Sequence, residues 1–176
     1  MAVPDQLSKN LKIAKSCIGE LVQDIKEGTL ADDKNNVYQV LSFKWGPFLL
    51  TIIDKGRFVT VEIGVKILKE VRDKLSSLPD EVREQYRIAM LQEMLSNHRT
   101  GSTLIPQNLP DIRQFEGFYL QQHIHLTDGA ISCNRLVDGI QEIVTVGVRV
   151  LNVLSLGLGM SATMNSPVKP APDIYG

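Results

Sequence analysis

His123 and His125 are the residues of this chain whose type and spacing could do chemistry. They lie in the run FYLQQHIHLTD (118–128), whose aromatic and β-branched residues predict a strand. Strand residues two apart point to the same face, so both imidazoles could bind zinc together with a third group such as His98 or Asp128. The alternative is a pair of solvent-facing histidines. A metal-binding protein or metal-dependent hydrolase is therefore the second hypothesis for function.

The two cysteines, Cys17 and Cys133, offer no further site. They are far apart in the sequence and lack the spacing of a metal or redox motif, which is typical of free, buried thiols in a reducing compartment. The alternative is a disulfide between them. Neither has an evident neighbouring base, so neither is a candidate nucleophile. With no triad arrangement and no phosphate-binding loop, we expect a protein that is not an enzyme and needs no cofactor.

The composition indicates one folded domain. Of 176 residues, 43% are hydrophobic and 22% are charged, which is ordinary for a globular protein. Lys and Arg number 19 against 20 Asp and Glu, and the two signs are interspersed, so no positive field exists to attract nucleic acid. The N-terminus lacks a secretory signal pattern, which predicts a cytoplasmic protein. We expect the domain to span residues 1–160, with a flexible, proline-containing tail at 161–176.

Hydrophobic spacing predicts an α+β fold with an antiparallel sheet. Residues 7–25 carry apolar positions at spacings of four and three, which predicts a helix that Asp5 could cap and Gly28 could end. In the third of the strands that follow, apolar positions alternate with Thr60 and Glu62, so these two should face solvent at least in part. Three strands, a pair of helices and the histidine-bearing strand follow the first helix; the expected ranges are 37–43, 48–54, 57–65, 67–78, 79–97 and 118–128.

The run EIVTVGVRVLNVLSLGLGM (142–160) is the most apolar stretch of the chain. Arg149 and Asn152 near its middle argue against a membrane span. Alternating valines favour a strand. A helix beginning near Ser132 is favoured more strongly, because polar residues recur at spacings of four and three and would form one narrow stripe. That stripe comprises Asp138, Glu142, Thr145, Arg149 and Asn152.

Such a helix has more apolar circumference than one small sheet covers. Either the other predicted helices wrap it into a core, or a second copy of the chain covers it in a homodimer. Another polypeptide could also bind this helix or the neighbouring sheet face. The expected partner-binding residues are Trp45, in a turn where complete burial is hard, and Val144, Val148, Leu151 and Leu154.

Three segments resemble the type III secretion chaperone-like fold and the related YbjN-like small α/β families. They are LPDEVREQYRIAMLQEMLSNH (78–98), FYLQQHIHLTDG (118–129) and NRLVDGIQEIVTVGVRVLNVL (134–154). The resemblance implies a small, often dimeric protein that binds other polypeptides and has no catalytic centre. It also implies a strand pair before the closing helix, and residues 103–105 are the candidate second strand. The leading hypothesis is therefore a non-enzymatic, chaperone-like protein that dimerises and binds another polypeptide.

Overall fold

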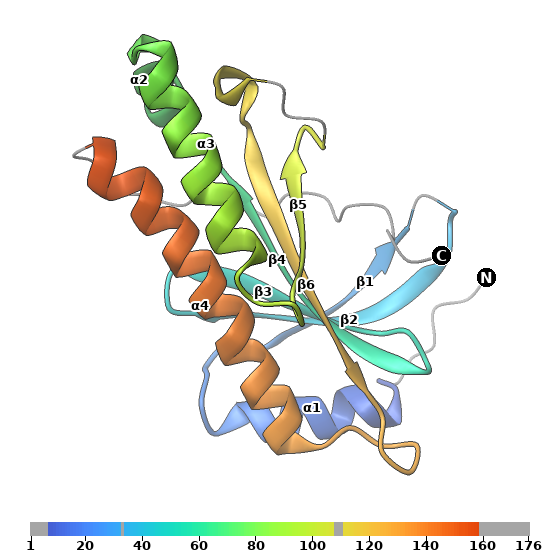
Figure 1. Ribbon diagram of the computed structural model, residues 1–176. Helices are drawn as coiled ribbons and strands as arrows, with labels where there is room; N and C mark the ends of the chain where they lie inside the picture. Colours follow the sequence, from blue (N-terminus) through green and yellow to red (C-terminus); the bar gives the residue numbers. More distant parts are fainter. Residues whose placement is uncertain (1–6, 33, 108–110, 159–176) are drawn as a thin grey trace.

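Figure 1 shows a computed structural model of the chain, which describes residues 7–32, 34–107 and 111–158. The expected helix cap Asp5 and the expected tail at 161–176 lie outside these ranges. The elements are α1 (Lys9–Gly19), β1 (Lys26–Ala31), β2 (Val37–Trp45), β3 (Phe48–Asp54), β4 (Phe58–Lys66), α2 (Lys69–Ser77), α3 (Asp80–Leu95), β5 (Gly101–Ile105), η1 (Ile112–Gln114), β6 (Gly117–His125) and α4 (Cys133–Leu158).

The strands form one antiparallel sheet in the order β1-β2-β3-β4-β6-β5. α3 and α4 lie side by side across one face of this sheet, and α1 packs near the end at which α4 begins (Figure 1). The α+β class and the helix order expected from the sequence are confirmed. β5 contains residues 103–105, which the sequence analysis proposed as the second strand of a pair. It pairs with β6, the strand that precedes α4 in the chain.

The first helix is shorter than its hydrophobic spacing predicts. α1 begins after Ser8, whose Oγ accepts a hydrogen bond from the Leu11 N–H at 3.2 Å, and it ends at Gly19. The expectation that the helix continues to Gly28 is wrong, because residues 26–31 form β1 and pair with β2. The apolar positions of α1 that remain helical supply its buried face.

A hydrogen-bonded turn, rather than apolar alternation, secures β1 in the sheet. The strand itself is polar and mostly exposed. In the turn that follows, the Asp32 carboxylate accepts the backbone N–H of Lys34 at 2.9 Å, and it accepts both the backbone N–H and the side-chain Nδ2 of Asn36 at 2.8 and 2.9 Å. The side-chain bond from Asn36 does most to lower the pKa of Asp32, because it favours the ionised carboxylate. Such a turn has no hydrophobic periodicity, so the sequence analysis missed β1.

α4 is a helix, as favoured, and its own chain covers most of its apolar surface. Its polar stripe is exposed at Asp138, Thr145, Arg149 and Asn152 and half-buried at Glu142. Leu151 and Leu154 are buried in the core of the subunit, while Val144 and Val148 are half-buried. α4 is therefore a core helix, which is one of the two interpretations that its sequence allowed. Within the described ranges, no helix has an apolar stretch long enough to cross a membrane.

Two glycines let α4 approach the sheet closely. A methyl group added at Gly147 would lie 2.6 Å from Cζ of Phe48, whose ring is buried. A methyl group added at Gly139 would lie 3.0 Å from Cδ1 of Ile124 on β6. The contact at Gly147 is closer than a packed interior allows, and the contact at Gly139 is tight enough that the Ile124 side chain would have to shift, so the absence of a side chain at these positions lets the helix approach the sheet.

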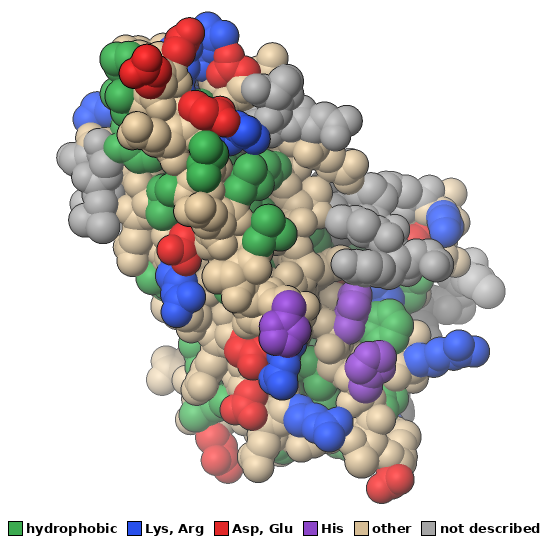
Figure 2. Space-filling view, in the orientation of Figure 1, with side chains coloured by type: hydrophobic (Ala, Val, Ile, Leu, Met, Phe, Trp, Pro, Cys, Tyr) green, Lys and Arg blue, Asp and Glu red, His purple; other side chains and the backbone are tan. Residues whose placement is uncertain are grey.

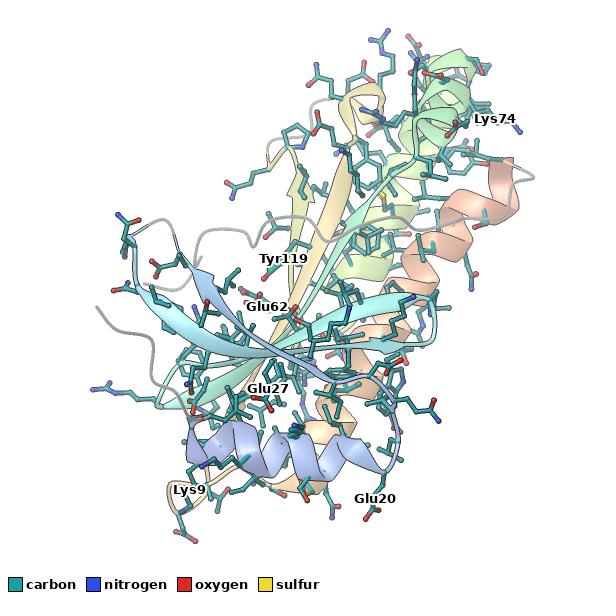
Figure 3. The ribbon with its side chains drawn as sticks, turned by 180° about the vertical axis from the view of Figure 1, so that it is seen from behind. Lys9, Glu20, Glu27, Glu62, Lys74 and Tyr119 are labelled. Carbon is teal, nitrogen blue, oxygen red and sulfur yellow. A yellow bond between two sulfur atoms is a disulfide. The ribbon has the colours of Figure 1, made fainter. Side chains whose placement is uncertain are left out.

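The sheet face away from α3 and α4 is polar but largely buried. Glu62 and Tyr119 lie on this face, as Figure 3 shows from behind. The expectation that Thr60 and Glu62 face solvent at least in part is wrong, because both side chains are buried. Thr60 lies between Ile53 and His123 of the neighbouring strands, and these larger side chains flank its short one.

Cys17 and Cys133 form a disulfide that joins α1 to the start of α4, with their Cα atoms 5.4 Å apart. The expectation of two free, buried thiols is therefore wrong. The cysteines are 116 positions apart in the sequence, and only the packing of α1 against α4 brings them together. Disulfides of this kind are typical of oxidising compartments.

Replacing Gly147 should test the close approach of α4. We expect Gly147→Ala to lower the free energy of unfolding by about 1–3 kcal/mol, because the added methyl group overlaps the Phe48 ring. The matched control is Gly19→Ala in α1, where nothing lies within 4 Å of the added group, and which should change stability by less than about 1 kcal/mol. Urea unfolding followed by circular dichroism measures both. Equal effects of the two substitutions would contradict the close packing.

Removing the disulfide should destabilise the chain through its unfolded state. The bond closes a loop with a separation of 116 residues, so Cys17→Ser with Cys133→Ser should lower the free energy of unfolding by about 2–5 kcal/mol. Unfolding of the wild-type chain in reducing buffer should match that of the double variant. Mass spectrometry of the oxidised protein after alkylation provides the check, and two alkylated thiols would contradict the bond.

Candidate functional site

A cavity of 610 Å³ lies where the α3–β5 loop, the end of β6 and the first half of α4 meet. It contains all three histidines of the chain, and Figure 2 shows them gathered on one face among basic and acidic side chains. The lining residues are His98, Arg99, Thr100, Gly101, Gln121, Gln122, His123, Ile124, His125, Arg135, Asp138, Gly139 and Glu142. We call this cavity the β6-end pocket.

The β6-end pocket exists because β5 is shorter than β6. β5 pairs with β6 only from Gly117 to Gln121, so strand pairing on this side of β6 stops at the edge of the pocket. Backbone groups of a strand point alternately to its two sides. The Glu116 C=O accepts the Ile67 N–H at 2.8 Å on the β4 side, and the β4–β6 register runs unbroken to His125. The backbone groups of His125 therefore face the pocket side.

Glu142 is the carboxylate at the centre of the pocket's hydrogen bonds. One of its oxygens accepts the Gln122 Nε2–H at 2.8 Å, and the other accepts the Arg99 guanidinium at 3.3 Å. Its side chain is 29% exposed, whereas that of Arg99 is 67% exposed. Asp138 precedes Glu142 by one helical turn and lies on the same side of α4. The Arg99–Glu142 pair is thus an exposed contact of the kind that stabilises little.

Two buried polar atoms in the pocket lack hydrogen-bond partners among the described residues. They are Oε1 of Gln122 and Oγ1 of Thr100, on side chains that are 8% and 7% exposed. The orientation of the Gln122 amide follows from its neighbours, because its Nε2 donates to Glu142 and the reverse orientation would place two acceptors together. Buried polar groups are normally satisfied, so an acceptor left over in a cavity wall indicates a ligand or solvent site.

His123 and His125 are held against an aromatic ring rather than in a metal-ligand arrangement. Their rings lie 4.7 and 6.3 Å from that of Phe58, centroid to centroid, and the His123 Nδ1 is 3.0 Å from the Thr60 hydroxyl oxygen. His98 also lines the pocket, but Asp128 does not. In the part of the chain that the structure describes, no group of three or more His, Cys, Asp and Glu side chains is placed to hold a metal ion.

The residues expected to bind a partner lie away from the β6-end pocket. Trp45 pairs in register with Phe48, whose ring packs against Gly147 of α4. This brings Trp45 near the helix segment that bears Val144 and Val148, all three being half-buried. Leu151 and Leu154 instead face the core. None of the five lines the β6-end pocket, which the sequence analysis found only through its histidines.

No family model matches the chain, and no curated protein matches it. A solved structure that does match is the crystal structure of an uncharacterized protein from Methanothermobacter thermautotrophicus, with a TM-score of 0.66 and 14% sequence identity. The similarity covers 85% of this chain and 99% of that chain. At this level of identity the likeness establishes a shared fold and nothing about function.

Proposed function

We propose that the protein is a non-enzymatic binding module that captures a segment of another polypeptide at the β6-end pocket. One observation carries this proposal: the pairing of β6 with β5 stops at Gln121, and a pocket whose lining includes polar atoms left unsatisfied by the described residues begins there. An extended peptide could continue the sheet at this point, which is a common mode of peptide recognition. The conclusion keeps the polypeptide-binding role that the sequence favoured and moves it away from the apolar surface of α4.

The chemistry of the pocket suits a polypeptide better than an apolar ligand. Its volume of 610 Å³ can hold one or two side chains, and its walls combine Arg99 and Arg135 with Asp138 and Glu142. A bound backbone would pair with the outward-facing groups of His125, while the side chains of the peptide would meet this mixed polar wall. Main-chain hydrogen bonds would supply affinity, and the pocket would supply specificity.

A proline at position 125 should test the strand-addition model. Peptides selected from a random-sequence library against the full chain should bind His125→Ala about as well as wild type, because alanine keeps the backbone N–H. His125→Pro removes that donor without breaking the β4–β6 ladder, and it should weaken binding about three- to tenfold, the effect of one net hydrogen bond. Isothermal titration calorimetry measures both affinities.

Amide hydrogen exchange supplies the second readout for the same peptides. The His125 N–H should exchange more slowly in the complex than in the free chain. Equal binding by His125→Pro, together with unchanged exchange at residue 125, would contradict strand addition at this edge.

Homodimerisation is the second candidate, and the exposed apolar residues of α3 favour it. Ile88 and Leu95 are 44% and 73% exposed and lie seven positions apart on one side of the helix. We expect concentration-dependent association in sedimentation velocity at tens of micromolar, and loss of association in Leu95→Glu. Asn152→Glu, an equally exposed change on α4, is the control and should leave association unchanged. A strict monomer at these concentrations would remove the dimer hypothesis.

Two further parts of the hypothesis rest on the sequence alone. A chaperone-like role follows from the resemblance to the secretion chaperone-like fold, and it requires that the bound polypeptide be a client. The cytoplasmic location is likewise an expectation from the sequence. The Cys17–Cys133 disulfide counts against that location, because such bonds are uncommon in the cytosol of most organisms.

A further inference from the structure

We propose that the inner wall of the β6-end pocket, formed by Glu142, Gln122 and Thr100, is a subsite for an arginine side chain of the bound polypeptide. In this arrangement the incoming guanidinium displaces Arg99 from Glu142. That the arginine belongs to a polypeptide rests on the proposed function. The subsite itself rests on the hydrogen-bonding capacity of these side chains.

The wall offers acceptors that the described residues leave unused. Gln122 Oε1 can only accept a hydrogen bond, and it has no donor. Thr100 Oγ1 can accept as well as donate, and it too has no partner. Glu142 adds a half-buried carboxylate that meets one firm partner, Gln122, and one exposed partner, Arg99. A ligand group that satisfies this wall must therefore carry several N–H donors and a positive charge.

A guanidinium group matches this requirement more closely than other side chains. It is planar, always charged, and presents five N–H donors in a fixed fork, with no acceptor of its own. It could donate to the Glu142 carboxylate with one edge. Its other edge could donate to the Gln122 carbonyl oxygen, which is buried in this structure and would have to become accessible when Arg99 moves away. Asp138, one turn away on α4 and exposed, would add attraction at the mouth of the pocket.

The Arg99 side chain already occupies the position beside Glu142 that is proposed for the ligand guanidinium. Its guanidinium already donates to Glu142, but the contact is long at 3.3 Å and the side chain is mostly exposed. The backbone of Arg99 is fixed separately, because its N–H donates to the Asn97 side chain at 2.9 Å. The arginine side chain can therefore swing away without disturbing the loop that carries it. Arg99 would then compete with a ligand arginine, and removing it should improve binding.

The two arginines of the pocket could instead attract an anion, but the inner wall opposes one. An anion beside Arg99 would also face Glu142, Asp138 and the carbonyl oxygen of Gln122, which all repel negative charge. Arg135 lies at the rim, where its guanidinium donates to the Thr127 hydroxyl at 3.2 Å. The unsatisfied acceptors lie inside, and the basic groups lie at the exposed edge.

The test uses N-acetyl-L-arginine N′-methylamide as the probe and N-acetyl-L-norleucine N′-methylamide as its uncharged counterpart. Each is titrated into the full chain while the side-chain amide resonance of Gln122 is followed by NMR. The arginine probe should shift this resonance in a saturable way at millimolar concentrations, and the norleucine probe should not. Glu142→Gln should weaken the arginine probe at least fivefold, whereas Arg99→Ala should strengthen it about threefold, by removing the weak competing pair.

Matched controls come from an ion pair on α3 outside the pocket. Glu84→Gln and Arg87→Ala alter a comparable pair, in which Arg87 Nε donates to Glu84 at 2.8 Å, and neither should change the probe affinity. Asp138→Asn provides a second pocket variant at an exposed position where folding is not at risk, and it should weaken the probe about twofold. The dispersion of amide resonances verifies that each variant is folded.

Two outcomes of the probe titrations would overturn the inference. One is an arginine probe that does not shift the Gln122 resonance, and the other is an affinity that Glu142→Gln and Asp138→Asn leave unchanged. Selected peptides that pair along His125 but contain no arginine would also overturn it, while the proposed function would stand. If the arginine probe saturates the subsite but no selected peptide pairs with the backbone of His125, the subsite is supported and the proposed function is refuted.

Discussion

The close packing of α4 against the sheet is the constraint on which the rest of the structure depends. Gly147 and Gly139 leave no side chain between the helix and the strands beneath it, so Phe48 and Ile124 fill the space up to the helix backbone. A helix that lay farther from the sheet would leave a gap, which packed interiors do not tolerate. The same approach brings α1 to the start of α4, where the disulfide joins them.

This packing also creates the candidate site. The inward-facing positions of β6 are Phe118, Leu120, Gln122 and Ile124, and three of the four are apolar. Gln122 is the exception, and it reaches the first half of α4. There its amide meets Gly139 and donates to Glu142. The polar groups of a side chain in the core need hydrogen-bond partners. Among the described residues, the Gln122 NH₂ group has one, and its carbonyl oxygen does not. The unpaired carbonyl oxygen belongs to a side chain that lines a cavity. This position suggests a binding site and not a packing defect.

Long-range hydrophobic periodicity was the dependable guide to the fold. It predicted α4 correctly because five polar residues recur in register over fifteen positions, beyond what a strand alternation over a few valines can explain. It failed for β1, which is held by the Asp32 turn and by backbone pairing with β2, neither of which leaves an apolar pattern. The disulfide was missed for another reason: the cysteine spacing suggested free thiols, and contacts between residues 116 positions apart depend on tertiary packing.

The candidate site was predictable only in part, and for a physical reason. His123 and His125 stood out because histidine chemistry is recognisable from residue type. In the structure their rings pack against Phe58, and the backbone of His125 forms part of a strand edge. Gln122 directly precedes His123 in the sequence, and in the strand alternation it takes the same side as the apolar residues Leu120 and Ile124. What the sequence could not show is that β5 stops at the level of Gln121, since the length of a paired strand depends on both partners.

The surplus of apolar surface expected on α4 has a different location in the folded chain. The helix places Leu136, Leu151 and Leu154 in the core. The neighbouring helix α3 instead carries large exposed apolar side chains, Ile88 and Leu95. Self-association through α3 and polypeptide capture at the β6-end pocket therefore use separate surfaces, and one need not obstruct the other. A fold fixes where strands and helices lie, whereas binding depends on individual side chains such as Gln122 and Glu142.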